Sequence, residues 1–200
     1  MSRTVPSWLA DPVAIVIGEG EGLEAVAHEL AAAGATIARG PVAASRAIAA
    51  AAIGAATLAA RDPVTLLIHA GSPATAQRAD LLGPGDWRAG MQAGLDSRFF
   101  YAAEFAQSLI AQGKPGAILF LDLPGEAGGA VQAAASGALS NLTKTLAVEW
   151  ARDGIRVNTI ASRVVKGGTK AELRGLGALA AYLVSDFAAY ITGSVMGVDD

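Results

Sequence analysis

The sequence contains no cysteine and only two histidines among its 200 residues. The absence of thiols excludes disulfides and thiolate metal sites, and His28 and His69 alone do not favour a histidine-based metal centre. Charged residues make up only 16% of the chain, the formal net charge is −3, and no block of like charges occurs. This balance offers no basic patch for nucleic acid or for an anionic membrane surface.

The sequence also lacks the segments that direct a chain to a membrane. Its first residues, MSRTVPSWLADP, have no apolar core of the kind that secretory signals carry, and no apolar run reaches transmembrane length without interruption. We therefore expect a cytoplasmic protein that binds neither membrane nor nucleic acid. The hydrophobic residues, at 52%, are enough for a buried α/β core.

Short apolar runs alternate with helical patterns along the whole chain. The runs predict six strands: Pro12–Gly18, Ala35–Ala38, Val64–His69, Ala117–Leu123, Arg156–Ile160 and Gly193–Val198. The intervening patterns predict five helices: Leu23–Ala33, Ala43–Ala60, Asp86–Gln112, Ala133–Arg152 and Ala171–Asp186. Such alternation implies right-handed crossovers and a Rossmann-like, doubly wound parallel sheet in one domain spanning residues 1–200.

Two passages near the C-terminus are quite specific. They are LTKTLAVEWARDGIRVNTIAS at Leu142–Ser162 and SDFAAYITGSVMGVDD at Ser185–Asp200. Together with shorter matches at Gly18–Gly22, Leu66–Gly71 and Asp86–Leu95, they resemble the short-chain dehydrogenase/reductase family. The resemblance implies a Rossmann-fold NAD(P) oxidoreductase that forms dimers or tetramers. It also implies that one strand and helix at a sheet edge are lost, and that the substrate lid is shortened to about Arg163–Lys170.

Each catalytic position of that family departs from its pattern in this chain. The family's Asn falls on Gly94, its Ser near Asp122, its Tyr on Gln132 and its Lys on Ser136. No Tyr in the chain is followed four residues later by Lys. An amide cannot act as a general acid or base, and losing that role costs about 10²–10⁴-fold in rate. We therefore predict no residue that catalyses hydride transfer, and rescue by Tyr101, Tyr182 or Tyr190 is disfavoured.

The glycine turn that would hold a dinucleotide has also changed. Gly18, Gly20 and Gly22 keep glycine at alternate positions, but Glu19, Glu21 and Glu24 surround the start of the following helix. Pyrophosphate needs bare backbone N–H groups there, and a carboxylate about 5 Å from a phosphate charge costs on the order of 3 kcal/mol at an effective dielectric of 20. We expect no cofactor on this chain. Two interpretations stay open: the carboxylates occupy the anion site themselves, or they are solvated loop charges.

Three further polar residues have both a functional and a structural interpretation. Arg39, after the second predicted strand, stands where a residue selective for NADP could be, but a lone arginine there is more often a surface residue. His69 ends a buried strand and is predicted to be structural. Asp122 could be a lone catalytic carboxylate, although capping of the loop Pro124–Gly129 is the favoured role.

Apolar residues cover more than one face of the predicted helix Asp86–Gln112, and a stripe follows the helix Ala133–Arg152. A helix that packs only on its own sheet needs one apolar face, so the extra face predicts a subunit contact. The alternative is a deep core. The predicted interface comprises Trp87, Met91, Leu95, Phe99, Leu139, Leu142, Leu146 and Trp150.

Three functions follow as hypotheses. The favoured one is a catalytically inactive subunit that pairs with an intact paralogue in a heterodimer or heterotetramer and stabilises or completes the paralogue's site. NAD or NADP would then be bound by the partner. The second is an enzyme with altered, non-hydride chemistry that uses Asp122, Gln132 or Ser136. The third is a stand-alone binding or regulatory module.

Overall fold

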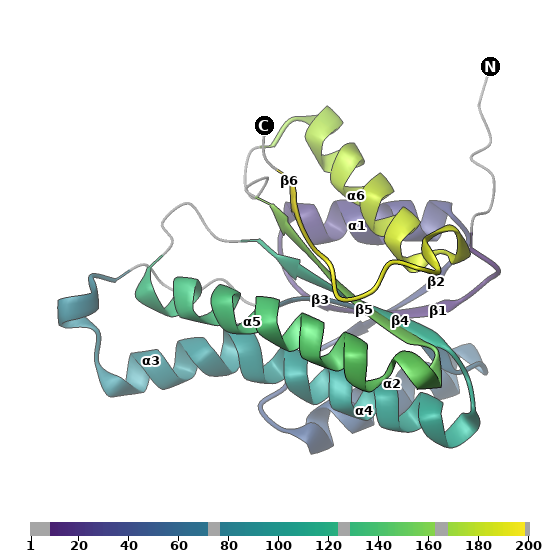
Figure 1. Ribbon diagram of the computed structural model, residues 1–200, viewed down its shortest axis with the longest axis horizontal. Coiled ribbons are helices and arrows are strands. Elements are labelled where there is room, and N and C mark those ends of the chain that lie inside the picture. The colour runs from purple at the N-terminus through teal and green to yellow at the C-terminus, as the bar shows by residue number, and fades with distance from the viewer. Residues whose placement is uncertain (1–8, 72–76, 124–128, 163–167, 199–200) are drawn as a thin grey trace.

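The computed structural model describes residues 9–71, 77–123, 129–162 and 168–198. These residues form one parallel sheet with the strand order β2-β1-β3-β4-β5-β6 (Figure 1). The strands are β1 (Val13–Gly18), β2 (Thr36–Gly40), β3 (Val64–Gly71), β4 (Gly116–Asp122), β5 (Ile155–Ser162) and β6 (Val195–Val198). The six-stranded, doubly wound parallel sheet expected from the sequence is therefore confirmed.

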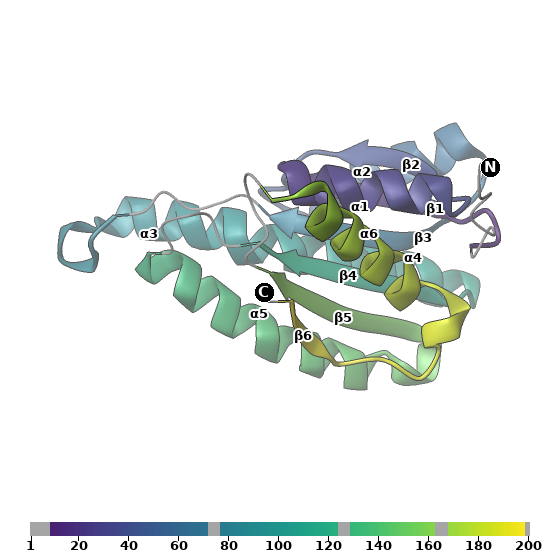
Figure 2. The same ribbon diagram turned by 90° about the horizontal axis from the view of Figure 1, so that it is seen from above.

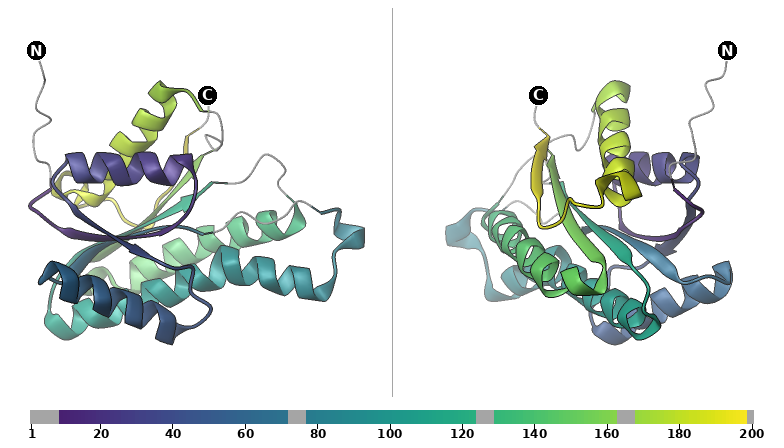
Figure 3. Two further views of the ribbon diagram at one scale, coloured as in Figure 1. Left: turned by 180° about the vertical axis from the view of Figure 1, so that it is seen from behind. Right: turned by 45° about the vertical axis from the view of Figure 1, so that its right-hand side comes forward.

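The helices lie in two layers, one on each face of the sheet (Figures 1 and 2). Helices α1 (Glu21–Ala32) and α6 (Lys170–Val184) pack side by side on one face. The other face carries α2 (Arg46–Ala60), α4 (Ser97–Gln112) and α5 (Ala130–Glu149), as the view from behind in Figure 3 also shows. Because both faces are covered, the central strands are buried along nearly their whole length, as their continuous apolar runs require.

Each layer encloses its own apolar core. On the α1–α6 side, Leu23 and Val26 pack with Leu176 against the sheet. On the other side, Tyr101 and Phe105 of α4 pack with the apolar side chains of β1, β3 and β4. The two cores fix the sheet between the helix layers, so the carboxyl ends of β1, β3 and β4 meet at one rigid edge.

The predicted long helix over residues 86–112 is divided in the structure. Helix α3 (Pro84–Met91) leads into a π-helical turn, η2 (Gln92–Asp96), and then into α4. Gly94 lies at the centre of this turn, and a Cβ added to it would lie 3.2 Å from the Cβ of Ala135 in α5. The glycine thus permits close contact between the turn and α5.

Short 3₁₀ turns complete the described chain: η1 (Ala79–Leu81), η3 (Ala151–Asp153) and η4 (Asp186–Ala188). Helix α6 begins with a capping box in which Thr169 and Glu172 satisfy each other's backbone N–H groups. Within the described residues, no helix has the length and apolar character needed to cross a membrane.

Candidate functional site

The candidate site lies at the carboxyl edge of the sheet, where the strand order reverses between β1 and β3. Ligands of doubly wound sheets bind in the crevice at this switch point. Here Gly18 ends β1 and pairs with Gly71 at the end of β3. Gly18 has a φ of +112°, and a Cβ added to it would lie 2.7 Å from the carbonyl oxygen of Gly71. Only glycine therefore fits at the end of β1.

The glycine turn leads into α1 without a side-chain cap. Gly20 is the N-cap residue and has no side chain that could accept a hydrogen bond from the first turn of the helix. Glu24 instead reaches Arg39, at 2.7 Å between carboxylate and guanidinium, and both side chains are largely exposed. For Glu24, this geometry favours the solvated-charge interpretation over an internal substitute for phosphate. It also makes Arg39 a surface residue whose charge is already compensated by a carboxylate.

A buried arginine that the sequence did not point out, Arg98, lies at the carboxyl ends of β3 and β4. Its guanidinium donates to the carbonyl oxygens of Gly94, Ala70 and Leu121, the last two at 2.5 and 2.6 Å. The side chain is only 2% exposed, and its Nε–H has no partner among the described residues. Burial lowers the pKa of Arg98 from 12.5 to about 10, and the charge of Asp122 acts in the opposite direction.

Arg98 also fills the space beside the end of β3. A Cβ added to Gly71, whose φ is +70°, would lie 2.8 Å from a guanidinium nitrogen of Arg98. The guanidinium of Arg98 thus lies at the carboxyl edge of the sheet, next to the switch point. The sequence spacing could have indicated its burial. Arg98 lies three, four and seven residues before the buried Tyr101, Ala102 and Phe105, on the same helical face.

His69 is held by hydrogen bonds at both ring nitrogens. Nδ1 accepts from the backbone N–H of Gly71 at 2.8 Å, so the proton resides on Nε2, which donates to the hydroxyl of Ser97 at 2.9 Å. Ser97 accepts a further bond from the backbone N–H of Ala43. Burial and the charge of Arg98 hold the pKa of His69 well below its usual value. His69 is therefore a neutral structural residue, as predicted.

The predicted positions Asp122, Gln132 and Ser136 come together in one hydrogen-bonded cluster. The Ser136 hydroxyl donates to Asp122 Oδ1 at 3.0 Å, and the Gln132 amide donates to the same oxygen and to Ser136 Oγ, both at 3.2 Å. Asp122 lies at the end of β4, and the other two residues lie one turn apart on α5. The cluster therefore offers a carboxylate that orients a hydroxyl, and an amide that does not titrate.

The structure separates the other candidates from this cluster. Tyr101 is buried, its hydroxyl donates to the carbonyl oxygen of Pro41, and burial raises its pKa to about 12. Tyr182 and Tyr190 are exposed near the C-terminal end of α6 and beyond η4. The loop Pro124–Gly129 that Asp122 was predicted to cap, and the predicted shortened lid Arg163–Lys170, lie mostly outside the described residues.

The predicted interface residues divide into two groups. Trp87 and Phe99 are each 40% exposed, and Met91, Leu95 and Leu142 are partly buried. Leu139, Leu146 and Trp150 instead pack in the chain's own core. Their assignment to the interface was wrong, because the α5 stripe faces the sheet; Trp150 alone also lines a shallow surface pocket of about 430 Å³ beside Ile110. Among the described residues, no three His, Cys, Asp or Glu side chains are grouped as a metal site requires.

Comparison with known proteins gives consistent results. Residues 11–176 match the family model described as enoyl-(acyl carrier protein) reductase. The chain is 28% identical over 164 residues to galactitol 2-dehydrogenase (L-tagatose-forming) of Cereibacter sphaeroides, covering 68% of this chain and 65% of that protein. It is 34% identical over 149 residues to the "Probable 2,4-dienoyl-CoA reductase" of Bacillus subtilis strain 168, covering 60% and 59%. The chain thus spans about three fifths of the length of these relatives.

Solved structures show the same fold. A short chain dehydrogenase from Mycobacterium smegmatis superposes with a TM-score of 0.86 at 18% identity, covering 100% of this chain and 97% of that one. A gluconate 5-dehydrogenase from Burkholderia cenocepacia J2315, in complex with NADP and tartrate, has a TM-score of 0.78 at 23% identity and covers 96% of each chain.

Proposed function

Because this chain belongs to the short-chain dehydrogenase/reductase family, we propose that it is a non-catalytic subunit of an NAD(P)-dependent oxidoreductase. It pairs with an intact family member in a heterodimer or heterotetramer and stabilises or completes that partner's site. The scaffold is that of an oxidoreductase, and the proposal concerns what this copy of the scaffold does.

The hydrogen-bonded cluster of Asp122, Gln132 and Ser136 is the observation that carries the proposal. Carbonyl reduction needs a proton donor beside the carbonyl oxygen and a group that lowers the donor's pKa. The cluster supplies an amide and a hydroxyl whose hydrogen-bonding capacity is directed at a carboxylate of the same chain. At the positions of Gln132 and Ser136, a substrate carbonyl would therefore meet neither a titratable proton donor nor a cation.

The residues at the switch point do not fit a dinucleotide well. Exposed carboxylates at the start of α1 oppose pyrophosphate, and Arg39 is paired with Glu24. Arg98 occupies the sheet edge beside Gly71. We therefore propose that NAD or NADP is bound by the partner and not by this chain.

The apolar surface available to a partner comprises fewer residues than the sequence predicted. Trp87, Phe99 and Ile110 are exposed, and the partly buried Met91 completes an apolar strip along α3 and α4, whereas Leu95 packs against the chain's own core. Exposed aromatic side chains on a helical face are typical of subunit contacts, where they supply most of the buried area. We propose that this strip is the partner surface.

Co-expression tests the pairing. The chain is produced with a dehydrogenase from a neighbouring gene that retains Tyr-x-x-x-Lys, and the complex is sought by co-purification and native mass spectrometry. We expect a complex of both chains that Phe99→Glu abolishes. Leu58→Glu, at a side chain that is 81% exposed on α2, is the matched control and leaves the complex intact. Failure of the two chains to co-purify would contradict the proposal.

Nucleotide titration of the isolated chain tests the remaining part. We expect no measurable binding of NAD(H) or NADP(H) by calorimetry. Micromolar affinity for either nucleotide would show that the crevice is functional in this chain and would remove the basis of the proposal.

The geometry of the cluster also favours a second candidate, an enzyme with non-hydride chemistry. The Ser136 hydroxyl donates to the Asp122 carboxylate, and this arrangement can orient a nucleophile or a water molecule. If the purified chain alone turns over a substrate without nucleotide, and both Asp122→Asn and Ser136→Ala abolish turnover while the far-UV circular dichroism is unchanged, this candidate replaces the first.

A further inference from the structure

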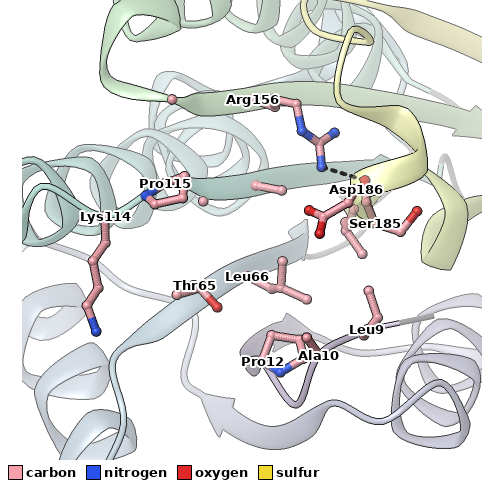
Figure 4. Close-up of a pocket in the computed structure, with 14 residues that line it drawn as sticks. Leu9, Ala10, Pro12, Thr65, Leu66, Lys114, Pro115, Arg156, Ser185 and Asp186 are labelled. Carbon is pink, nitrogen blue, oxygen red and sulfur yellow. Dashed lines mark hydrogen bonds between the residues drawn. The ribbon is translucent and has the colours of Figure 1, made fainter. Parts of the chain in front are cut away.

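A pocket lies at the amino edge of the sheet, opposite the candidate site. It has a volume of about 450 Å³, within the range of about 300–1,000 Å³ typical of small-molecule sites. The starts of β1, β3, β4 and β5 border it, together with the end of α6 and η4. Figure 4 shows its lining side chains. No residue of the candidate site contributes to it.

The floor of this pocket is apolar. Leu9, Leu66 and Val184 line it and are themselves anchored in the core between the sheet and the α1–α6 layer. Pro12 and Pro115 add rigid apolar walls. A hydrocarbon placed here would be removed from water at a favourable free energy of about 25 cal/mol per Å².

The polar groups are segregated at the two ends. In Figure 4, Lys114 lies at one end, while Arg156, Ser185 and Asp186 lie at the other, with Leu66 between them. Arg156 donates to the carbonyl oxygens of Leu183 and Ser185, so its charge compensates the negative C-terminal end of α6. Asp186 lies close enough to Arg156 to oppose the effect of burial on the pKa of that arginine.

Lys114 is the remaining cation of the pocket. It is exposed, and no ion pair involving its ammonium group occurs among the described residues. With Arg156 compensated by Asp186 and by the helix end, the pocket has one uncompensated positive charge in a chain whose net charge is −3. A single uncompensated cation at one end of an apolar floor, with offsetting charges at the far end, favours a ligand with one negative charge.

We propose that this pocket binds a small linear monocarboxylate, with its carboxylate at Lys114 and its hydrocarbon chain over Leu66 towards Val184. A second carboxylate at the far end of the ligand would lose hydration beside Arg156 and Asp186, whose charges offset one another, and is therefore disfavoured. The site is independent of the subunit role proposed above and requires neither a nucleotide nor a partner.

Three ligands of similar length separate the contributions. The ¹⁵N-labelled full-length chain is titrated with octanoate, with octanamide, which lacks the charge, and with octanedioate, which carries a second one. We expect octanoate to shift the amide signals of Thr65, Gly116 and Gly154 while those of Gly18 and Gly71 stay unchanged. Octanamide and octanedioate are each expected to bind at least roughly fivefold more weakly, the scale of one exposed ion pair.

Two variants and a control complete the test. Lys114→Gln is expected to weaken octanoate binding by roughly fivefold, and Ala10→Trp, at an exposed lining residue, is expected to block it. Lys170→Gln removes the same charge at the start of α6 and leaves the affinity unchanged. Absence of localised shifts with octanoate, equal affinity for octanamide, or equal loss in Lys114→Gln and Lys170→Gln would each overturn the proposal.

Discussion

Replacing Arg98 by methionine removes a buried cation while keeping an unbranched side chain in its place. The three carbonyl oxygens that accept from the guanidinium, those of Gly94, Ala70 and Leu121, then lose a donor. Asp122 also loses the cation whose charge acts on it at the sheet edge. The variant therefore tests whether Arg98 holds the ends of β3 and β4 to the π turn.

The expected cost follows from two opposing effects. A buried acceptor left unsatisfied costs about 1–3 kcal/mol, so three of them cost roughly 6 kcal/mol. Methionine also removes the cost of burying the charge. The fall in the pKa of Arg98 from 12.5 to about 10 corresponds to roughly 3 kcal/mol. The difference leaves a net loss of stability on the order of 3 kcal/mol, close to that measured when one partner of a buried pair is removed.

Urea unfolding followed by far-UV circular dichroism at pH 7.5 measures this loss. Arg88→Met, at an exposed arginine of α3, is the matched control and should change the free energy of unfolding by less than about 0.5 kcal/mol. Arg98→Lys keeps the charge but has one ammonium for three carbonyls, so an intermediate loss is expected. A free energy of unfolding for Arg98→Met within about 1 kcal/mol of that of the parent chain would refute this role for Arg98.

Three further outcomes are expected. Folding lowers the pKa of His69, so the contribution of this residue to stability is fully present above the unfolded-state pKa near 6.5. As the pH falls below 6.5, the free energy of unfolding should decrease by up to about 1.4 kcal/mol per pH unit. Urea midpoints from pH 7.5 to 5 measure this decrease, and His69→Gln should flatten the profile. Gly40→Ala should destabilise the chain by about 1–3 kcal/mol, since its Cβ would lie 2.7 Å from the Tyr101 hydroxyl, and Tyr101→Phe should recover part of that loss in thermal unfolding. Thr169→Ala removes the capping box of α6 and should cost about 1 kcal/mol; a change below about 0.3 kcal/mol would contradict the role of the cap.

The sheet was predictable because its central strands are continuous apolar runs in the sequence. Buried strands such as β3 must be apolar on both faces, and VTLLIHAG has almost no polar interruption. Helix starts were less certain where capping residues are missing. Helix α5 begins at Ala130, three residues before the predicted start, because Gly129 is its N-cap and provides no side-chain signal.

The cluster at the sheet edge was only partly accessible from the sequence. Gln132 and Ser136 are four residues apart and share one helical face, so their proximity follows from spacing alone. Their contact with Asp122 depends on how α5 packs against β4, which no local pattern encodes. Arg98 was missed because arginine is rarely buried, although its spacing to Tyr101 and Phe105 places it on the inner face of α4.

The interface assignment shows a different limit. A stripe of apolar residues at helical spacing is the same whether it faces the chain's own sheet or another subunit. On α5 the stripe through Leu139 and Leu146 faces inward. On α3 and α4 the exposed aromatics lie on the outer side, and only the fold distinguishes the two cases.

The π turn at Gln92–Asp96 determines how the outer side of this long helix is organised. An i→i+5 ladder takes up one residue more per turn than an α-helix, so residues on either side of the turn are out of phase by about 100°. In an uninterrupted α-helix, Trp87 and Phe99 would point about 120° apart, whereas the extra residue reduces the angle to about 20°. The π turn thus shifts the helical phase by one residue, so that the side chains of α3 and α4 lie along a single strip. Deleting one residue within it would restore a regular α-helix in which Trp87 and Phe99 stay about 20° apart, so the strip would be kept while the π turn is lost.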